Sequence, residues 1–149
     1  MELFNANERT LNYTDKQGVS YVLKLRGTIT IVKQASGTGK TLLAESLKAF
    51  KKVSEVKGIS CSNILIITEE NMLSKVKNVT NHLIIIDKAD RLLKGKEDII
   101  NSINTDFRGN TYLLFARKNV GIAHTPNSEA EFIRMGNEIR LNYLFNIEG

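Results

Sequence analysis

The residues best suited to chemistry lie in one glycine-rich stretch that ends in Gly39-Lys40-Thr41. Successive backbone N–H groups of such a turn point inward and bind an anion, and a following helix adds the partial positive charge of its N-terminus. Lys40 would neutralise a bound polyphosphate, and the Thr41 hydroxyl would bind Mg²⁺. We therefore expect nucleotide binding by eight consecutive residues: Gln34, Ala35, Ser36, Gly37, Thr38, Gly39, Lys40 and Thr41.

One position of this loop departs from the usual pattern. Gln34 stands where a first glycine is expected, five residues before Gly39. If that position needs a left-handed backbone, a residue with a side chain costs about 1–2 kcal/mol. Such a cost would weaken nucleotide binding without abolishing it. The alternative is an ordinary strand-to-helix turn made of small residues, with no ligand.

A second candidate is Asp87, which directly follows the apolar run at 83–86. Its carboxylate would lie at the carboxyl end of a buried strand, where open α/β sheets bind their ligands. From there it would reach Mg²⁺, usually through water. The predicted metal ligands are therefore Thr41 and Asp87. The alternative is an acidic residue that merely ends a buried strand.

The elements that must position these residues follow from the apolar pattern. Four short runs are apolar without alternation, which is typical of strands buried on both faces: 29–32, 64–67, 83–86 and 112–116. Helical spacing lies between them, with shared faces formed by Leu43, Leu47 and Phe50, by Met72, Leu73 and Val76, and by Ile99, Ile100 and Ile103. This alternation predicts an α/β fold with an open, mostly parallel sheet and flanking helices.

Both ends of the chain alternate instead. A turn at 15–18 between alternating segments predicts an N-terminal β-hairpin. Gly136-Asn137 predicts a two-residue turn before a C-terminal hairpin or edge strand, with one face formed by Ile139, Leu141, Tyr143 and Phe145. Because linkers and repeats are lacking, we expect one nucleotide-binding domain over 1–149. It would comprise a hairpin extension (1–27), a core (28–118) and a C-terminal hairpin (119–149).

With these motifs, the chain resembles the P-loop NTPase superfamily over about residues 28–118, and within it the AAA and STAND-type branch. It is also similar to short, uncharacterised bacterial P-loop proteins. The resemblance implies that Asp87 is the Walker B aspartate and that the strand at 28–33 neighbours the one at 111–117, not the one at 82–87. It implies the catalytic residues Lys40, Asp87 and Arg117. Arg117 would touch the γ-phosphate, and a surface arginine at a strand end is an equal alternative.

One departure from this branch bears on turnover. A glutamate commonly follows the Walker B aspartate there and activates the attacking water, but this chain has Lys88. A protonated lysine is no general base. Lys88 could add positive charge near the γ-phosphate or point to solvent, and Asp90 is a weak substitute for the acid. We therefore expect binding of ATP or GTP with Mg²⁺ and slow or absent hydrolysis.

Composition narrows the class of protein. The net charge is +5, but the basic residues are interleaved with acidic ones, which favours a solvated surface over a nucleic-acid footprint. The single cysteine, Cys61, permits no intrachain disulfide. No stretch suits a membrane span or a secretory signal, so a cytoplasmic protein is expected. His82 and His124 stand alone, which argues against a metal other than Mg²⁺.

Three functions remain open from the sequence. The first is a nucleotide-responsive module with at most weak ATPase activity, acting with a protein partner. The second is a small-molecule kinase, which needs a mobile lid that brings arginines over the phosphates; Arg134 and Arg140 could serve, but their segment is predicted to be a hairpin rather than a lid. The third is a degenerate P-loop fold kept as a protein-interaction domain, which Gln34 and Lys88 favour.

Overall fold

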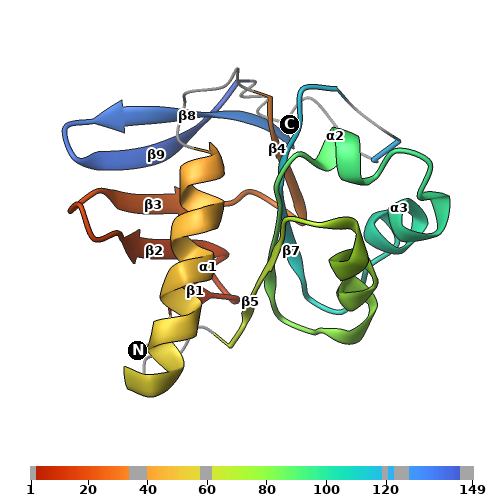
Figure 1. Ribbon diagram of the computed structural model, residues 1–149. Coiled ribbons are helices and arrows are strands. Elements are labelled where there is room, and N and C mark those ends of the chain that lie inside the picture. Colours follow the sequence, from red (N-terminus) through yellow and green to blue (C-terminus); the bar gives the residue numbers. More distant parts are fainter. Residues whose placement is uncertain (1–2, 34–39, 58–61, 119–120, 123–127, 145–149) are drawn as a thin grey trace.

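A computed structural model describes residues 3–33, 40–57, 62–118, 121–122 and 128–144. The described strands form one nine-stranded sheet in the order β1-β2-β3-β9-β8-β4-β7-β6-β5 (Figure 1). The strands are β1 (Phe4–Asn5), β2 (Thr10–Thr14), β3 (Ser20–Lys24), β4 (Ile29–Val32), β5 (Ile64–Ile67), β6 (Leu83–Ile86), β7 (Thr111–Phe115), β8 (Glu129–Met135) and β9 (Glu138–Tyr143). The helices are α1 (Lys40–Lys57), the 3₁₀ helix η1 (Glu70–Asn78), α2 (Ala89–Leu92) and α3 (Glu97–Asn104).

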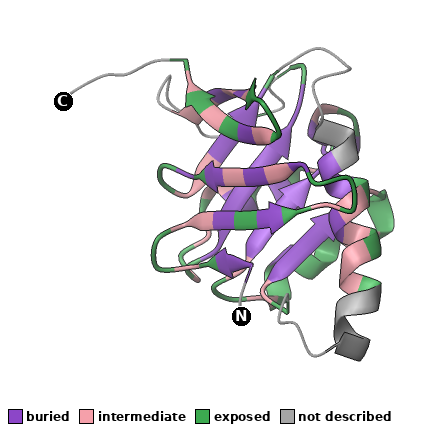
Figure 2. Cartoon of the chain, turned by 90° about the vertical axis from the view of Figure 1, so that its left-hand side faces the viewer, coloured by how far each residue is buried: buried purple, intermediate pink, exposed green. Residues whose placement is uncertain are grey.

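The four strands predicted from continuous apolar runs are confirmed as β4, β5, β6 and β7. They pair in parallel, β4 with β7, β7 with β6, and β6 with β5. The prediction that the first of these strands neighbours the last, and not the third, is therefore confirmed. Every residue of β5, β6 and β7 is buried, whereas the hairpin strands alternate between buried and exposed positions (Figure 2). Continuous burial explains why these runs are apolar throughout.

Helices cover both faces of this parallel part of the sheet. On one face, Leu43 and Leu47 of α1 pack against Ile66 and Ile85. On the other face, η1, α2 and α3 pack against the alternate residues of the same strands. The predicted helical faces are confirmed for α1 and α3. The second predicted helix is a 3₁₀ helix, which still buries Leu73 and Val76.

The two predicted hairpins are present. β2 pairs antiparallel with β3 across the turn at 15–18, and β8 pairs antiparallel with β9 across Gly136, whose φ of +64° suits glycine. The hairpins also pair with one another, because β3 and β9 lie parallel with Ser20 opposite Glu138. β8 in turn pairs with the end of β4. The hairpins are therefore part of the main sheet.

The predicted fold class, an α/β fold with an open, mostly parallel sheet and flanking helices, is wrong. The sheet is mixed and curls around α1 until its two edges approach each other. The side-chain amide of Asn63, just before β5, donates a 2.8 Å hydrogen bond to the carbonyl of Phe4 in β1. Residues of β1, β2 and β3 join α1 and the parallel strands in one apolar core. The sheet curls because β2, β3 and β9 each have one apolar face, and that face is buried against α1.

Candidate functional site

The predicted phosphate loop connects β4 to α1. β4 ends at Val32, and Lys40 is the first residue of the 18-residue helix α1. Gln34, Ala35, Ser36, Gly37, Thr38 and Gly39 lie outside the described residues. The backbone of Lys40 and Thr41 thus forms the first turn of α1, where N–H groups lack partners within the helix. A strand before the loop and a helix after it are the flanks that phosphate binding requires.

Asp87 lies at the carboxyl edge of the parallel strands. It directly follows β6, is only 6% exposed, and donates its backbone N–H to the Ile67 carbonyl at 3.0 Å. β7 lies between β6 and β4. Two strand spacings therefore separate the backbone of Asp87 from the end of β4, about 10 Å. The end of β7 lies between these two points, at the same edge of the sheet.

Arg117 follows β7 at the same edge and is exposed. The preceding residue, Ala116, donates its N–H to the Val32 carbonyl at 3.1 Å, so the backbone of Arg117 lies next to the exit of β4. A contact between Arg117 and a γ-phosphate stays a prediction. Its backbone lies between the ends of β4 and β6, at the edge that also carries Asp87.

Lys88 has an unusual backbone. Its φ and ψ are 51° and 47°, a left-handed conformation that costs a residue with a side chain about 1 kcal/mol. Its carbonyl accepts 3.0 Å hydrogen bonds from the N–H groups of Arg91 and Leu92, which starts the short helix α2. The chain therefore bends sharply immediately after Asp87. The side chain of Lys88, at this bend, is exposed to solvent.

Two polar contacts at this edge were not predicted. Lys48 of α1 donates a 3.2 Å hydrogen bond to the hydroxyl of Thr68, which follows β5 beside the strand that carries Asp87. Lys33, just before the loop, forms a 2.6 Å ion pair with Glu129 at the start of β8. Both pairs join segments that are distant in sequence, so spacing carries no signal for them. Lys48 adds positive charge to the edge where phosphate binding is predicted, whereas the charge of Lys33 is neutralised by Glu129.

The predicted Mg²⁺ ligands fit that ion chemically. A carboxylate at Asp87 and a hydroxyl at Thr41 are hard oxygen donors, which Mg²⁺ prefers. In the described part of the chain, no group of three or more histidine, cysteine or acidic residues could hold a metal ion. Mg²⁺ would therefore be held jointly by these two residues, water and the oxygens of a bound phosphate chain.

A carboxylic acid with a clearly lowered pKa, Asp106, lies at the opposite end of the parallel strands. The fully buried Asp106 side chain, before β7, accepts hydrogen bonds from Arg108, Asn110 and Tyr112. Arg108 also donates to the carbonyls of Val76 and Lys77 at the end of η1. Burial raises the pKa of Asp106, but the three side-chain donors outweigh it and lower the pKa from 3.8 to about 2. Burial, and then Asp106, raise the pKa of Tyr112. This cluster is structural, because its groups bind each other.

The lowered pKa of Asp106 predicts an acid-dependent loss of stability. Because the folded pKa lies below the unfolded one, the carboxylate stabilises the fold fully above about pH 4, and this contribution is lost as the pH falls through 2. The shift corresponds to about 2 kcal/mol. Urea unfolding at pH 5 and pH 2 should show that Asp106→Asn loses about 2 kcal/mol less than wild type over this range. An equal loss in both proteins would contradict the assignment.

Comparison with known proteins assigns no family to the chain: no protein-family model, curated protein or solved structure matches it. Among the described helices, none is both long and apolar enough to cross a membrane.

Proposed function

We propose that this protein binds ATP or GTP together with Mg²⁺ at the carboxyl edge of β4, β7 and β6. One observation carries the proposal. Lys40 and Thr41 begin the long helix α1, the next element along the chain after the strand β4, and a buried aspartate, Asp87, follows the strand β6 two positions away in the sheet. A glycine-rich sequence followed by Lys40, and the buried carboxylate of Asp87, are the features that a Mg²⁺–nucleotide site combines at one sheet edge.

The proposed roles follow from position. The backbone of residues 34–41 and the N-terminus of α1 bind the phosphates, and Lys40 neutralises their charge. Thr41 and Asp87 hold Mg²⁺, which bridges phosphate oxygens and spreads their negative charge. Arg117 lies where it can reach the terminal phosphate. Lys48 raises the positive potential of the edge, which favours the approach of an anion.

Slow hydrolysis is part of the proposal. An attacking water needs a carboxylate that orients it and takes its proton, and Lys88 offers an ammonium group instead. This supports a nucleotide-responsive module over a fast ATPase. Direct pairing of β4 with β6 would favour a small-molecule kinase. In this sheet β7 lies between β4 and β6, so the strand order does not favour the kinase. The alternative of a degenerate P-loop chain that serves as an interaction domain predicts no nucleotide affinity at all.

Calorimetry with ATP and with GTP, each with and without Mg²⁺, tests the proposal, and a phosphate-release assay follows. We expect binding that Mg²⁺ strengthens in wild type but not in Asp87→Asn. Release should be far slower than about 1 s⁻¹, the low end of ordinary enzymatic rates. The proposal would be overturned if neither ATP nor GTP bound at a concentration of about 1 mM, because a dissociation constant above about 1 mM corresponds to very weak binding.

A carboxylate at position 88 should raise turnover. Lys88→Glu restores the acid that the wild type lacks, and general-base assistance is typically worth about 10²–10⁴ in rate. Because the backbone at this position is already left-handed, the exchange adds no new strain. Phosphate release under saturating ATP should rise at least about tenfold.

The matched control is Lys88→Gln. Like Lys88→Glu it removes the lysine charge, and glutamine has the same side-chain length as glutamate, but glutamine supplies no base. Its release rate should stay near that of wild type. Equal rates in Lys88→Glu and Lys88→Gln would mean that position 88 does not face the attacking water.

A further inference from the structure

Five exposed cations gather at the carboxyl ends of β6 and β7. Lys88 follows β6, Arg91 lies on α2, and Lys94 comes shortly after that helix. Arg117 and Lys118 follow β7, which is the neighbour of β6 in the sheet. α2 follows the end of β6, contacts β7 and lies at the upper end of the molecule in Figure 1. We call these five residues the basic surface.

The basic surface is not neutralised by the part of the chain that the structure describes. Along the sequence its cations alternate with Asp87 and Asp90, but Asp87 is buried, Asp90 is half-buried, and neither forms an ion pair with them. The segment 119–127, which follows Lys118, contains no acidic residue. Five other cations instead pair with acids of their own chain: Lys33, Lys77, Lys96, Arg108 and Arg140. The basic surface therefore presents its positive charge to solvent.

We propose that the basic surface binds the phosphate backbone of double-stranded nucleic acid without reading its sequence. Lysine binds a phosphate as a point charge, and arginine binds it through two parallel N–H donors. A duplex carries one negative charge per about 1.7 Å of its axis. Long side chains that start from neighbouring strands, about 5 Å apart, can therefore each reach a phosphate of the same duplex.

The basic surface lacks the features that other anionic partners require. The large apolar side chains exposed in the described chain are Phe107, Met135 and Leu144, and none of them belongs to this surface. Amphipathic docking to a membrane needs apolar side chains beside the basic ones. Single-stranded nucleic acid is usually held by stacking on exposed aromatic rings, and Tyr112 and Phe115 of β7 are buried. Contacts to the phosphates of a duplex need neither feature.

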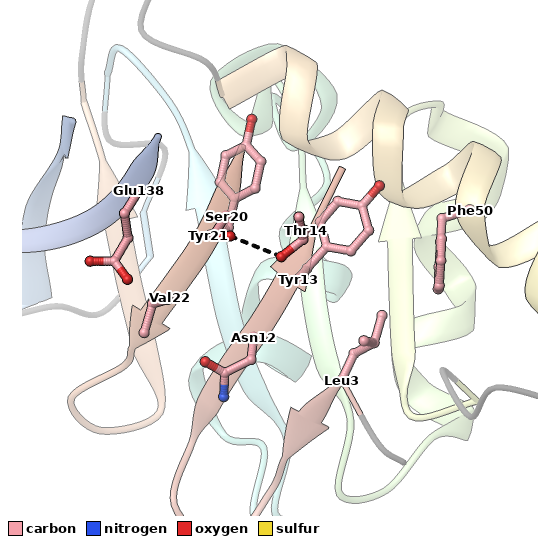
Figure 3. A pocket seen from close by; sticks show the side chains of 9 residues that line it. All are labelled: Leu3, Asn12, Tyr13, Thr14, Ser20, Tyr21, Val22, Phe50 and Glu138. Atoms are coloured by element: carbon pink, nitrogen blue, oxygen red, sulfur yellow. Dashed lines mark hydrogen bonds between the residues drawn. The ribbon is translucent and has the colours of Figure 1, made fainter. Parts of the chain in front are cut away.

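Another side of the molecule has a different character and supplies control positions. A hollow of about 470 Å³ lies between the β2–β3 hairpin and α1, and Glu138 is the charged residue among the described residues that line it (Figure 3). Lys16 and Lys24 of the hairpin segment and Lys52 of α1 are exposed. None of these three lysines lies on α2 or at the end of β6 or β7.

Fluorescence anisotropy of a labelled DNA duplex, measured without ATP or GTP, tests the proposal. We expect a dissociation constant of about 10 µM at about 50 mM NaCl, in the range of sequence-independent binding. Because four to five phosphates are neutralised, this constant should rise about 10- to 20-fold between about 50 and 100 mM NaCl. The triple variant Arg91→Glu/Lys94→Glu/Lys118→Glu should bind at least about 30-fold more weakly, since three attractive contacts become repulsive. Lys88 and Arg117 stay unchanged because they border the proposed nucleotide site, so failure here leaves that proposal untouched.

The matched control, Lys16→Glu/Lys24→Glu/Lys52→Glu, changes the net charge by the same amount and should bind within about threefold of wild type. Arg91→Gln/Lys94→Gln/Lys118→Gln should fall between wild type and the charge reversal, and circular dichroism checks the fold of each variant. The single strand should bind more weakly than the duplex, and phosphatidylserine vesicles should not co-sediment with the protein. The proposal is overturned by a wild type that does not bind the duplex at about 100 µM, the weak end of such affinities. Equal losses in the two charge-reversal variants, tighter binding of the single strand, or co-sedimentation with the vesicles would each overturn it as well.

Discussion

Replacing Lys40 by alanine is expected to weaken the binding of ATP and GTP at least about 100-fold while leaving the stability of the protein almost unchanged. Lys40 opens α1 beside the predicted phosphate loop, and in the proposed complex its ammonium group binds the charged end of the nucleotide. A charge-assisted contact to phosphate is roughly twice as strong as a neutral hydrogen bond, and a 100-fold loss corresponds to about 2.7 kcal/mol. Alanine is the best helix former, so the helix itself should tolerate the change.

Calorimetry measures the affinity, and thermal unfolding without nucleotide measures the stability. Lys52→Ala is the matched control, because it removes an exposed lysine from the same helix far from the loop. Its nucleotide affinity should equal that of wild type. If Lys40→Ala and Lys52→Ala bind alike, the Gly39-Lys40-Thr41 segment is not the phosphate site.

Asp106→Ala is expected to give the largest loss of stability, about 3–5 kcal/mol. The Asp106 carboxylate is fully buried, and its removal would leave Arg108, Asn110 and Tyr112 without their common acceptor. Most of the loss comes from the buried Asn110 and Tyr112 side chains, because each buried polar group left without its partner costs about 1–3 kcal/mol. The Arg108 guanidinium contributes less, because it is 34% exposed and keeps two carbonyl acceptors. The loss should appear as a lower urea midpoint with an unchanged slope.

An exposed carboxylate provides the control for this effect. Asp98 is 74% exposed and pairs with Lys77 at 3.4 Å. Asp98→Ala should therefore leave the free energy of unfolding close to that of wild type. A loss below about 1 kcal/mol in Asp106→Ala would show that the buried cluster stabilises the fold far less than its geometry suggests.

The sequence predicted those parts of the fold that depend on local burial. β4, β5, β6 and β7 could be placed because strands covered on both faces have no polar positions, and the order of β4 beside β7 also agrees. The hairpins could be placed from alternation and turn residues. The curled, mixed sheet could not be predicted. The alternation in β2 and β3 shows that one face of these strands is buried, but it does not show that α1 covers that face.

The candidate site divides in the same way. The position of Asp87 at a strand end and the start of α1 near Lys40 follow from short-range patterns. Two other features depend on tertiary packing: the contact between Lys48 and Thr68, and the left-handed backbone of Lys88. The identities of these residues do not predict either feature. The buried cluster around Asp106 could not be predicted either, since Asp, Arg, Asn and Tyr are common at exposed turns as well.

The pairing of β3 with β9 determines when this fold can be completed. Ser20 lies beside Glu138, so two strands that are far apart in the sequence share one row of hydrogen bonds. Until β9 has left the ribosome, one side of β3 remains an open edge that can pair with the wrong chain. Before that point β2 has its contact with α1, such as the 2.5 Å hydrogen bond between Tyr13 and Ser46. The growing chain thus carries an unpaired strand edge from the synthesis of β3 until the synthesis of β9.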